Sequence, residues 1–235
     1  MYFCIHTIHD YISLGYAAIA IYSSRRNEET MNLKQFEQTD LLSTKFEVQQ
    51  ATDTDIEWIA ELEKKTYSGI DAIPYTVLKE WYTANSNAFF VIRNKNGIRV
   101  GHVDILPLRQ ETLNEFISGK IIEHDIRGNS LFKPDEREKI NHLYIESLAI
   151  PYVKGFARSY ALKEVLLSLD KLIETICDPD FSTIIYAMPA SEEGKQIIEK
   201  LNFSITVEGK NRKGGYSIYK IPFFELKTAI QKITT

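Results

Sequence analysis

Residues 142–166, HLYIESLAIPYVKGFARSYALKEVL, decide how the rest of the chain is interpreted. The first part is typical of a buried strand that ends at Pro151, and the last part has apolar residues at helical spacing. The turn between them carries the small residues Gly155, Ala157 and Ser159. A helix that begins this way presents unpaired N–H groups and the positive end of its dipole. The stretch therefore predicts a backbone cradle for an anion such as a diphosphate.

The other segments predict the remaining elements of one α/β domain. Alternating patterns, β-branched runs, helical spacing and turn residues such as Asn96-Gly97 mark their limits. We expect strands at residues 45–50, 88–93, 98–106, 142–150, 182–188, 203–207 and 216–221. We expect helices from Asp53 or Asp55 onward, at 76–84, after the turn at 154–159, at 192–201 and at 224–233.

Residues 1–44 form an N-terminal extension that is expected to be loosely ordered in part, and the folded domain is expected at 45–235. The apolar run 11–22 is shorter than the ~20 residues that span a bilayer, so we expect no membrane span. Two interpretations stay open. Either Met31 is the true start and the residues before it belong to an over-extended reading frame, or the run forms a short helix that docks on the domain.

Residues 109–140 predict an insertion between two strands, with apolar residues at helical spacing around Leu113 and Phe116. Connections this long in a compact domain are more often functional than accidental. The insertion is interpreted either as a lid that shapes a substrate site or as a solvated decoration that caps one sheet edge.

Bulk properties narrow the class of protein. The chain has 235 residues and a formal net charge of −4, and its pI is near 5.8, so no global basic field indicates nucleic acid. Cys4 and Cys177 fit no zinc or CxxC spacing and suit a reducing, cytoplasmic compartment. The sequence contains no GxGxxG or GxxxxGK[ST] pattern and no metal-ligand cluster, so we expect no dinucleotide fingerprint, P-loop or metal site.

The order of the elements and two motifs resemble the GNAT superfamily of acyl-CoA-dependent N-acyltransferases over residues 46–221. The family's phosphate-binding motif, Q/R-x-x-G-x-G/A, is similar to Lys154-x-x-Ala157-x-Ser159. A shifted register, Tyr152-x-x-Gly155-x-Ala157, matches both small positions and lacks the cation. The first register is preferred because it places Ala161-Leu162 at the family's small-Leu pair.

The second motif is SEEGKQIIEKLNF at residues 191–203, which resembles the family's N-x-x-A-x-x-L-Y-E-K-L-G-F. Ser191 stands where the family has an Asn that faces the pantetheine arm. Ile198 stands where many members place a tyrosine that protonates the departing thiolate. Isoleucine has no proton to donate, so Tyr186, Tyr216 or solvent would have to take this role.

The resemblance implies an α/β (α+β) fold with a GNAT-type mixed, mostly antiparallel sheet, a splayed pair of central parallel strands and helices on both faces. It implies acetyl-CoA or another acyl-CoA as co-substrate, with no metal. The backbone of Leu148, Ala149 and Ile150 would pair with pantetheine. The diphosphate would lie on Lys154, Gly155, Phe156, Ala157, Arg158 and Ser159, with Ser191 beside the pantetheine arm.

Glu146 is the candidate general base. An amine is mostly protonated near neutral pH, so its attack on a thioester needs a group that removes a proton. Strand alternation places Glu146 on the same face as Leu148, beside the implied cleft. His142 and Asp104 are weaker candidates, because a lone polar residue on a strand is more often structural.

Two functions follow. The first is an N-acetyltransferase in which a primary amine, of a small molecule or a peptide, attacks acetyl-CoA directly. The second is a non-catalytic GNAT-fold domain that binds acyl-CoA or regulates a partner. The acidic pI favours cationic acceptors such as polyamines, aminoglycosides or lysine side chains, and a homodimer is left open.

Overall fold

The computed structural model describes residues 45–67 and 72–234, which form one seven-stranded sheet in the order β1-β2-β3-β4-β5-β7-β6. Neighbouring strands are antiparallel except β4 and β5, which are parallel. The strands are β1 (Phe46–Gln50), β2 (Phe89–Asn94), β3 (Arg99–Leu106), β4 (His142–Ala149), β5 (Ile184–Ala187), β6 (Ser204–Val207) and β7 (Ile218–Pro222).

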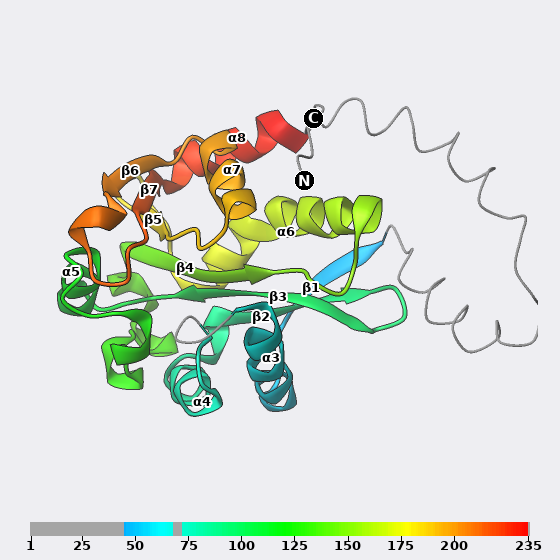
Figure 1. Ribbon diagram of the computed structural model, residues 1–235, viewed down its shortest axis with the longest axis horizontal. Coiled ribbons are helices and arrows are strands. Elements are labelled where there is room, and N and C mark those ends of the chain that lie inside the picture. Colours follow the sequence, from blue (N-terminus) through cyan, green and yellow to red (C-terminus); the bar gives the residue numbers. More distant parts are fainter. Residues whose placement is uncertain (1–44, 68–71, 235) are drawn as a thin grey trace, which may run out of the picture.

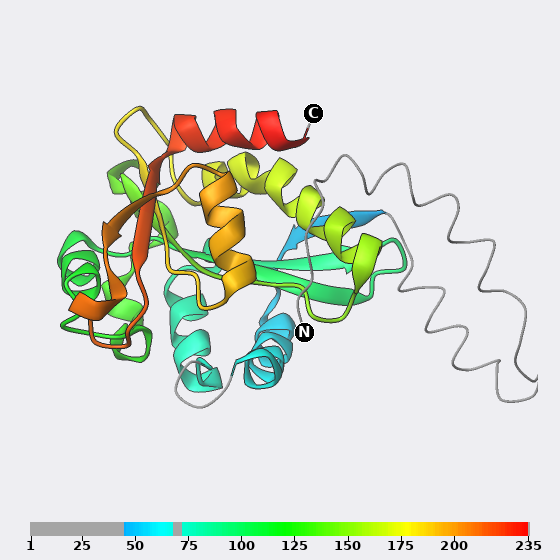
Figure 2. The same ribbon diagram turned by 45° about the horizontal axis from the view of Figure 1, so that its top comes forward.

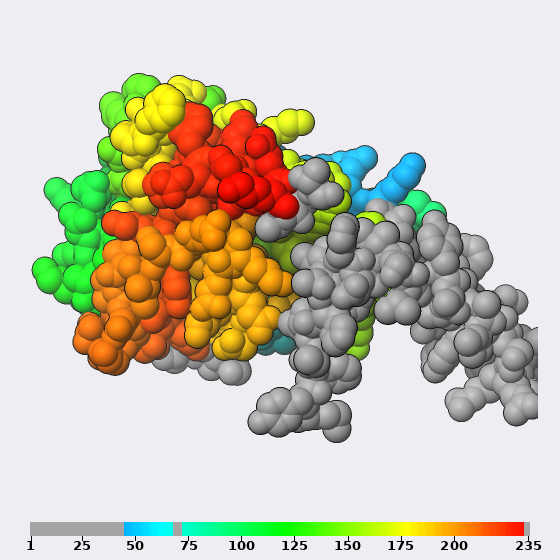
Figure 3. Space-filling model, turned by 90° about the horizontal axis from the view of Figure 1, so that it is seen from above, coloured from blue at the N-terminus to red at the C-terminus, as the bar shows by residue number. Residues whose placement is uncertain are grey.

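Helices cover both faces of the sheet, as Figures 1 and 2 show. One face carries α3 (Asp53–Thr66) and α4 (Tyr75–Ala84). The other carries α6 (Gly155–Ile176), α7 (Glu192–Lys200) and α8 (Phe223–Thr234), with α7 and α8 at the surface in Figure 3. Buried apolar side chains form one core cluster on each face. The predicted fold class and the order of the elements are confirmed.

The start of α3 is fixed by its own sequence and by the hairpin beside it. The Asp55 carboxylate accepts from the Thr52 backbone N–H (2.9 Å) and hydroxyl (2.7 Å). It is fully buried and also pairs with Arg93 (2.8 Å) and Arg99 (2.7 Å) of the β2–β3 hairpin. Burial raises the pKa of Asp55, but the Thr52 hydrogen bonds and the two arginines outweigh it and hold the pKa below its ordinary value. The carboxylate therefore ties α3 to the hairpin.

The predicted hairpin around Asn96-Gly97 is confirmed. Gly97 has a φ of +76°, and the Asn94 side-chain oxygen accepts from the backbone N–H groups of Asn96 and Ile98, each at 3.0 Å. Gly101, further along β3, is needed for a different reason. A Cβ there would lie 2.3 Å from the Ala149 carbonyl oxygen, so only glycine allows β3 to approach the end of β4.

Strands β4 and β5 pair only along the start of β4. The register runs from His142 opposite Ile184 to Ile145 opposite Ala187, where β5 ends. Strand β4 continues to Ala149 with β3 as its only described partner on that stretch. The two parallel strands therefore part in the middle of the sheet, as the resemblance implied.

A β-bulge lies at the point where the strands part. Asp104 of β3 is opposite Ser147, and Ile105 is opposite Ile145, so Glu146 is the extra residue on β4. The strict alternation that was used to place Glu146 on the face of Leu148 is therefore wrong. The bulge interrupts the alternation. Glu146 and Leu148 nevertheless line the same cavity, which is described below.

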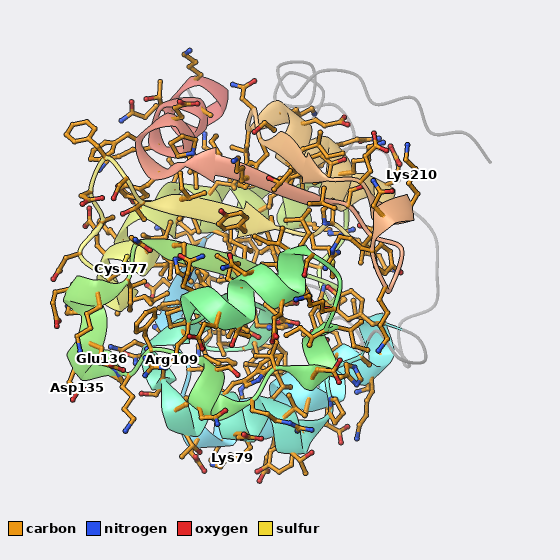
Figure 4. All side chains as sticks on the ribbon, turned by 90° about the vertical axis from the view of Figure 1, so that its left-hand side faces the viewer. Lys79, Arg109, Asp135, Glu136, Cys177 and Lys210 are labelled. Atoms are coloured by element: carbon orange, nitrogen blue, oxygen red, sulfur yellow. The ribbon has the colours of Figure 1, made fainter. Side chains whose placement is uncertain are left out.

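The insertion contains α5 (Gln110–Ile117) and the 3₁₀ turns η3 (Glu123–Asp125), η4 (Gly128–Ser130) and η5 (Pro134–Lys139). It lies against α4, where the Trp81 indole donates to the Ile126 carbonyl (3.0 Å). Arg109 and Glu136, side by side in Figure 4, join its two ends through a 2.7 Å ion pair. Arg212, from the β6–β7 connection, donates to the Phe116 carbonyl (2.8 Å). The insertion thus spans from α4 to the β6–β7 connection.

The expectations for residues 1–44 lie outside the described residues. Among the helices that the structure describes, none combines the length and apolar character needed to cross a bilayer. Cys177 is a buried free thiol.

Candidate active site

A cavity of about 160 Å³ opens where β4 and β5 part. Apolar side chains of α6 and α7 form one wall, and β4 contributes Ile145, Glu146 and Leu148. Polar groups converge from elements far apart in the sequence, namely Glu63 and Tyr67 from α3 and its C-terminal end, Glu123 from the insertion, and Tyr216. Three carboxylates and no Lys, Arg or His stand among the described residues that line the cavity.

Glu146 reaches the cavity from the bulge. Its Oε2 atom is buried and has no hydrogen-bond partner among the described residues. Burial raises the pKa of Glu146 well above its ordinary value, and the negative charges of Glu63, Glu123 and Asp104 raise it further. The carboxyl group therefore holds its proton to a higher pH than an exposed glutamate, and a cation that enters the cavity favours its ionised form.

Behind Glu146 lies a buried polar chain that the sequence analysis did not predict as a unit. His102 is fully buried between the Asp104 carboxylate (Nδ1–Oδ2 3.0 Å) and the Glu63 carboxylate (Nε2–Oε1 3.2 Å). Burial alone would lower the pKa of His102, but the two carboxylates outweigh it and raise the pKa to about 10. The ring is therefore a cation near neutral pH. The sequence did carry one sign of this, because residues 102 and 104 are polar within an otherwise apolar strand.

The two weaker candidates for the base lie away from the cavity. Asp104 is fully buried against His102 and is absent from the cavity lining. His142 is the first residue of β4, with its ring nitrogens 2.6 Å from the Leu108 carbonyl and 2.6 Å from the Asn141 side-chain oxygen. Burial lowers the pKa of His142. Both ring nitrogens are occupied, which fits a structural histidine.

The cradle residues stand at the start of α6. Lys154 is the N-cap residue and makes no side-chain cap hydrogen bond, and Gly155 has a φ of +55°. Ala157 is buried, whereas Lys154, Phe156, Arg158 and Ser159 are exposed. A positive φ favours glycine, so the backbone at position 155 explains why a glycine stands there. This supports the register Tyr152-x-x-Gly155-x-Ala157, in which Gly155 is a motif position, whereas the preferred register gives that glycine no role.

The cavity and the cradle are separate parts of the surface. None of the residues 154–159 lines the cavity, which meets α6 further along, at Val165, Leu166 and Leu169. Arg158 pairs with Glu193 of α7 (3.0 Å). The end of β4 connects the two parts, since Leu148 lines the cavity and the chain reaches the cradle shortly after the buried residues Ala149 and Ile150.

The second motif lies on the cavity wall. Ser191 lines the cavity, and its hydroxyl accepts from the Gly194 N–H (3.1 Å) as the N-cap of α7. Ile198 lines the cavity as well, at the position of the tyrosine that many family members use. Tyr216 is part of the lining and Tyr186 is not. Tyr67, at the C-terminal end of α3 and not among the residues predicted for the site, supplies a further hydroxyl.

Comparisons with known proteins found similar folds among solved structures. One is an acetyltransferase of the GNAT family from Listeria monocytogenes, with 14% identity over 76% of this chain and 95% of that chain and a TM-score of 0.48. A second is a putative phosphinothricin N-acetyltransferase, with 14% identity over 76% and 98% and a TM-score of 0.47. A third is a variant of the spermidine N-acetyltransferase SpeG from Vibrio cholerae, with 14% identity over 77% and 96% and a TM-score of 0.46.

No protein-family model and no curated protein matches the chain. The Listeria acetyltransferase is named as a member of the same family that the two motifs resemble. The fold itself is defined by the sheet order, the central parallel pair and the point where that pair parts.

Proposed function

We propose that this protein is an N-acyltransferase of the GNAT type, which transfers an acetyl group from acetyl-CoA to a primary amine. One observation carries the proposal. Where β4 and β5 part, a bulge presents Glu146 to a cavity whose wall is formed by α6 and α7. This arrangement combines a proton acceptor with a slot beside free strand backbone, which is what direct transfer to an amine requires.

The residues present fit acyl-CoA. The first turn of α6 has no side-chain cap, so its N–H groups can donate to a diphosphate, and the exposed Lys154 adds positive charge nearby. The backbone of 148–150 is not paired with β5 and would hold the pantetheine arm. When bound, acyl-CoA supplies a thioester whose carbonyl carbon bonds to the amine nitrogen as the C–S bond breaks. Ser191, already the cap of α7, would stand beside that arm.

Glu146 is proposed as the general base. Its raised pKa keeps it protonated at low pH, so the ionised and active fraction increases as the pH rises. Because Glu63 and Glu123 line the same cavity and no basic side chain does so among the described residues, the site favours a cationic acceptor. Polyamines, aminoglycosides and lysine side chains are the acceptor classes proposed. The buried free thiol of Cys177 fits the reducing cytoplasm, where we place the protein.

A second function is favoured by one specific residue. Ile198 fills the position of the usual acid with an apolar side chain on the cavity wall. A domain that binds acyl-CoA without turnover would need no proton donor at that position. The two functions make different predictions for the same assay.

The decisive assay follows thiol release from acetyl-CoA with spermidine, kanamycin and a lysine-containing peptide as acceptors. We expect turnover by the wild type and a decrease of about 100-fold or more in kcat for Glu146→Gln, with CoA affinity by calorimetry unchanged. Glu111→Gln, an exposed change on α5, is the matched control and should match the wild type. CoA binding without turnover would favour the non-catalytic domain, and no CoA binding would contradict both functions.

A further inference from the structure

A continuous chain of polar side chains runs from the cavity into the sheet. The Tyr67 hydroxyl lies 3.4 Å from the Ser147 hydroxyl, which donates to Glu63 Oε1 at 3.2 Å. Glu63 Oε1 is also 3.2 Å from His102, whose other ring nitrogen contacts Asp104. Tyr67 and Glu63 line the cavity, whereas Ser147, His102 and Asp104 are buried behind it.

The direction of the hydrogen bonds follows from the number of protons. Ser147 has one hydroxyl hydrogen, which it donates to Glu63. The 3.4 Å contact with Tyr67 therefore has the tyrosine as donor and the serine as acceptor. The Tyr67 oxygen keeps lone pairs that can accept a hydrogen from a molecule in the cavity. His102 lies beside this sequence of donors: its Nε2 is 3.2 Å from Glu63 Oε1 and 3.5 Å from Ser147 Oγ, and its Nδ1 faces Asp104.

We propose that Tyr67, Ser147 and Glu63 form a proton relay that takes a proton from the acceptor amine. This inference rests on the proposed function. As the ammonium group gives a proton to Tyr67 Oη, the Tyr67 hydrogen moves to Ser147 Oγ and the Ser147 hydrogen moves to Glu63 Oε1. The phenol and the hydroxyl are restored, Glu63 becomes neutral, and the amine is left with the lone pair that attack requires.

The relay and Glu146 have separate roles. A cationic amine loses two protons when it becomes an amide, one before attack and one as the C–N bond forms. The relay takes the first, and Glu146 takes the second. His102 is a positioning residue, because its ring nitrogen Nε2 lies 3.2 Å from Glu63 Oε1 and orients that carboxylate.

Loss of the Glu63 charge also acts on Glu146. Glu63 is the largest charged contribution to the raised pKa of Glu146, ahead of Glu123 and Asp104. When the relay neutralises Glu63, the pKa of Glu146 decreases and its ionised form becomes more accessible. Glu146 takes the second proton only in molecules in which it is already ionised, and the neutral Glu63 then no longer opposes its charge.

The activity arm of the test uses acetyl-CoA with spermidine, or with kanamycin or the lysine-containing peptide if one of these is the acceptor that turns over. Tyr67→Phe, Ser147→Ala and Glu63→Gln should each lower kcat by about 10- to 100-fold and flatten the pH profile. The double variant Tyr67→Phe/Ser147→Ala should be no slower than the slower single variant, because both changes break one chain. Ser147→Thr retains the hydroxyl and should restore most of the rate.

The control is Tyr82→Phe, which removes a tyrosine hydroxyl that donates to the Ala51 carbonyl away from the cavity. It should leave kcat unchanged. Position 67 is half-buried and tolerates the loss of one oxygen, so Tyr67→Phe should fold. A wild-type rate in this variant would overturn the relay and leave the proposed function standing. Additive losses in the double variant would overturn it as well. No turnover by the wild type with any acceptor would overturn the proposed function and the relay together.

The second arm needs no acyl-CoA. The imidazole pKa of His102 is measured in the free protein by NMR of labelled histidine, and Glu63→Gln should lower it from about 10, because one of its two carboxylates is lost. An unchanged His102 pKa in Glu63→Gln would show that Glu63 is not the ionised group in contact with the ring. That result would overturn the relay whether or not the enzyme turns over.

Discussion

At the residue scale, the proton on Glu146 links the site to the stability of the fold. The pKa of Glu146 is raised in the folded state above its ordinary value of 4.5, so the folded protein keeps a proton that the unfolded chain has lost. The contribution of this group to stability is complete below the unfolded pKa. It is lost as the pH rises through the folded pKa.

Glu146→Gln should remove this dependence. The amide imitates the protonated carboxyl at every pH, so the free energy of unfolding of the variant should increase relative to the wild type as the pH rises above about 4.5. Urea unfolding at a series of pH values measures the difference. A constant difference across that range would contradict the raised pKa. The groups that face Glu146, namely Glu63, Tyr67, Asp104, Glu123 and Tyr144, are kept intact in this comparison.

The sequence indicated Glu146 but not its surroundings. A carboxylate near the end of a strand before a tight turn is a local pattern, and it can be read without knowing the partners of the strand. The His102 site depends on three side chains from α3 and β3 that meet only in the folded chain. Nothing within one segment specifies that meeting, although the two polar residues in β3 were a sign of it.

At the element scale, the close approach of β3 to the end of β4 depends on Gly101. In Gly101→Ala, the new Cβ would lie 2.3 Å from the Ala149 carbonyl, so the end of β4 must shift. We expect a loss of about 2 kcal/mol in stability and a CoA affinity at least several-fold weaker, since the shifted backbone is the one that would hold pantetheine. Calorimetry and urea unfolding measure the two effects.

Gly97 provides the matched control for this change. A Cβ at Gly97 meets no atom within 4 Å, but the φ of +76° is strained for alanine. Gly97→Ala should therefore cost about 1 kcal/mol in stability and leave CoA affinity unchanged. Equal effects of the two variants on CoA affinity would contradict a special role for the approach at Gly101.

The tie between α3 and the hairpin gives a second prediction at this scale. Asp55→Asn leaves Arg93 and Arg99 without their common carboxylate and should lower stability by about 2 kcal/mol at pH 7. Because the pKa of Asp55 is lowered in the folded state, its contribution is present above the unfolded value of 3.8 and is lost as the pH falls through the folded pKa. The difference between variant and wild type should therefore shrink in acid.

Asp53→Asn, in the same turn of α3, is the control for Asp55→Asn. Its carboxylate is mostly exposed and, within the part of the chain that the structure describes, pairs with Lys79 at the surface, so urea unfolding should detect a change within about 0.5 kcal/mol. A loss in Asp53→Asn as large as that in Asp55→Asn would point to a general effect of charge at the helix N-terminus.

Helices, strands and turns were predictable where the residues that specify them are close together in the sequence. The strand, turn and helix at 142–166 and the hairpin at Asn96-Gly97 each depend on residues close in sequence, and both are confirmed. The bulge at Glu146 was not predictable from alternation, because it arises from the register between β4 and β3, whose sequences are separated by the insertion. A register is a property of two strands and cannot be read from one.

At the scale of the whole molecule, the sequence was enough to recognise the insertion at 109–140 but not to predict where it packs in the fold. Its length and helical spacing were plain in the sequence. Its packing against α4 and its contact with Arg212 depend on elements on either side of it in the chain. Through Glu123 it adds one carboxylate to the lining of the cavity.

The parting of β4 and β5 also divides the domain mechanically. Strands β1 to β4 form one half-sheet and β5 to β7 form another, and the backbone pairs between the halves run only from His142 to Ile145. We expect that short seam to act as a hinge line, because few backbone pairs join the two halves. A small rotation of one half against the other would widen or narrow the slot while every ladder within each half stays intact, so the width of the slot is set by how the helices pack across the seam.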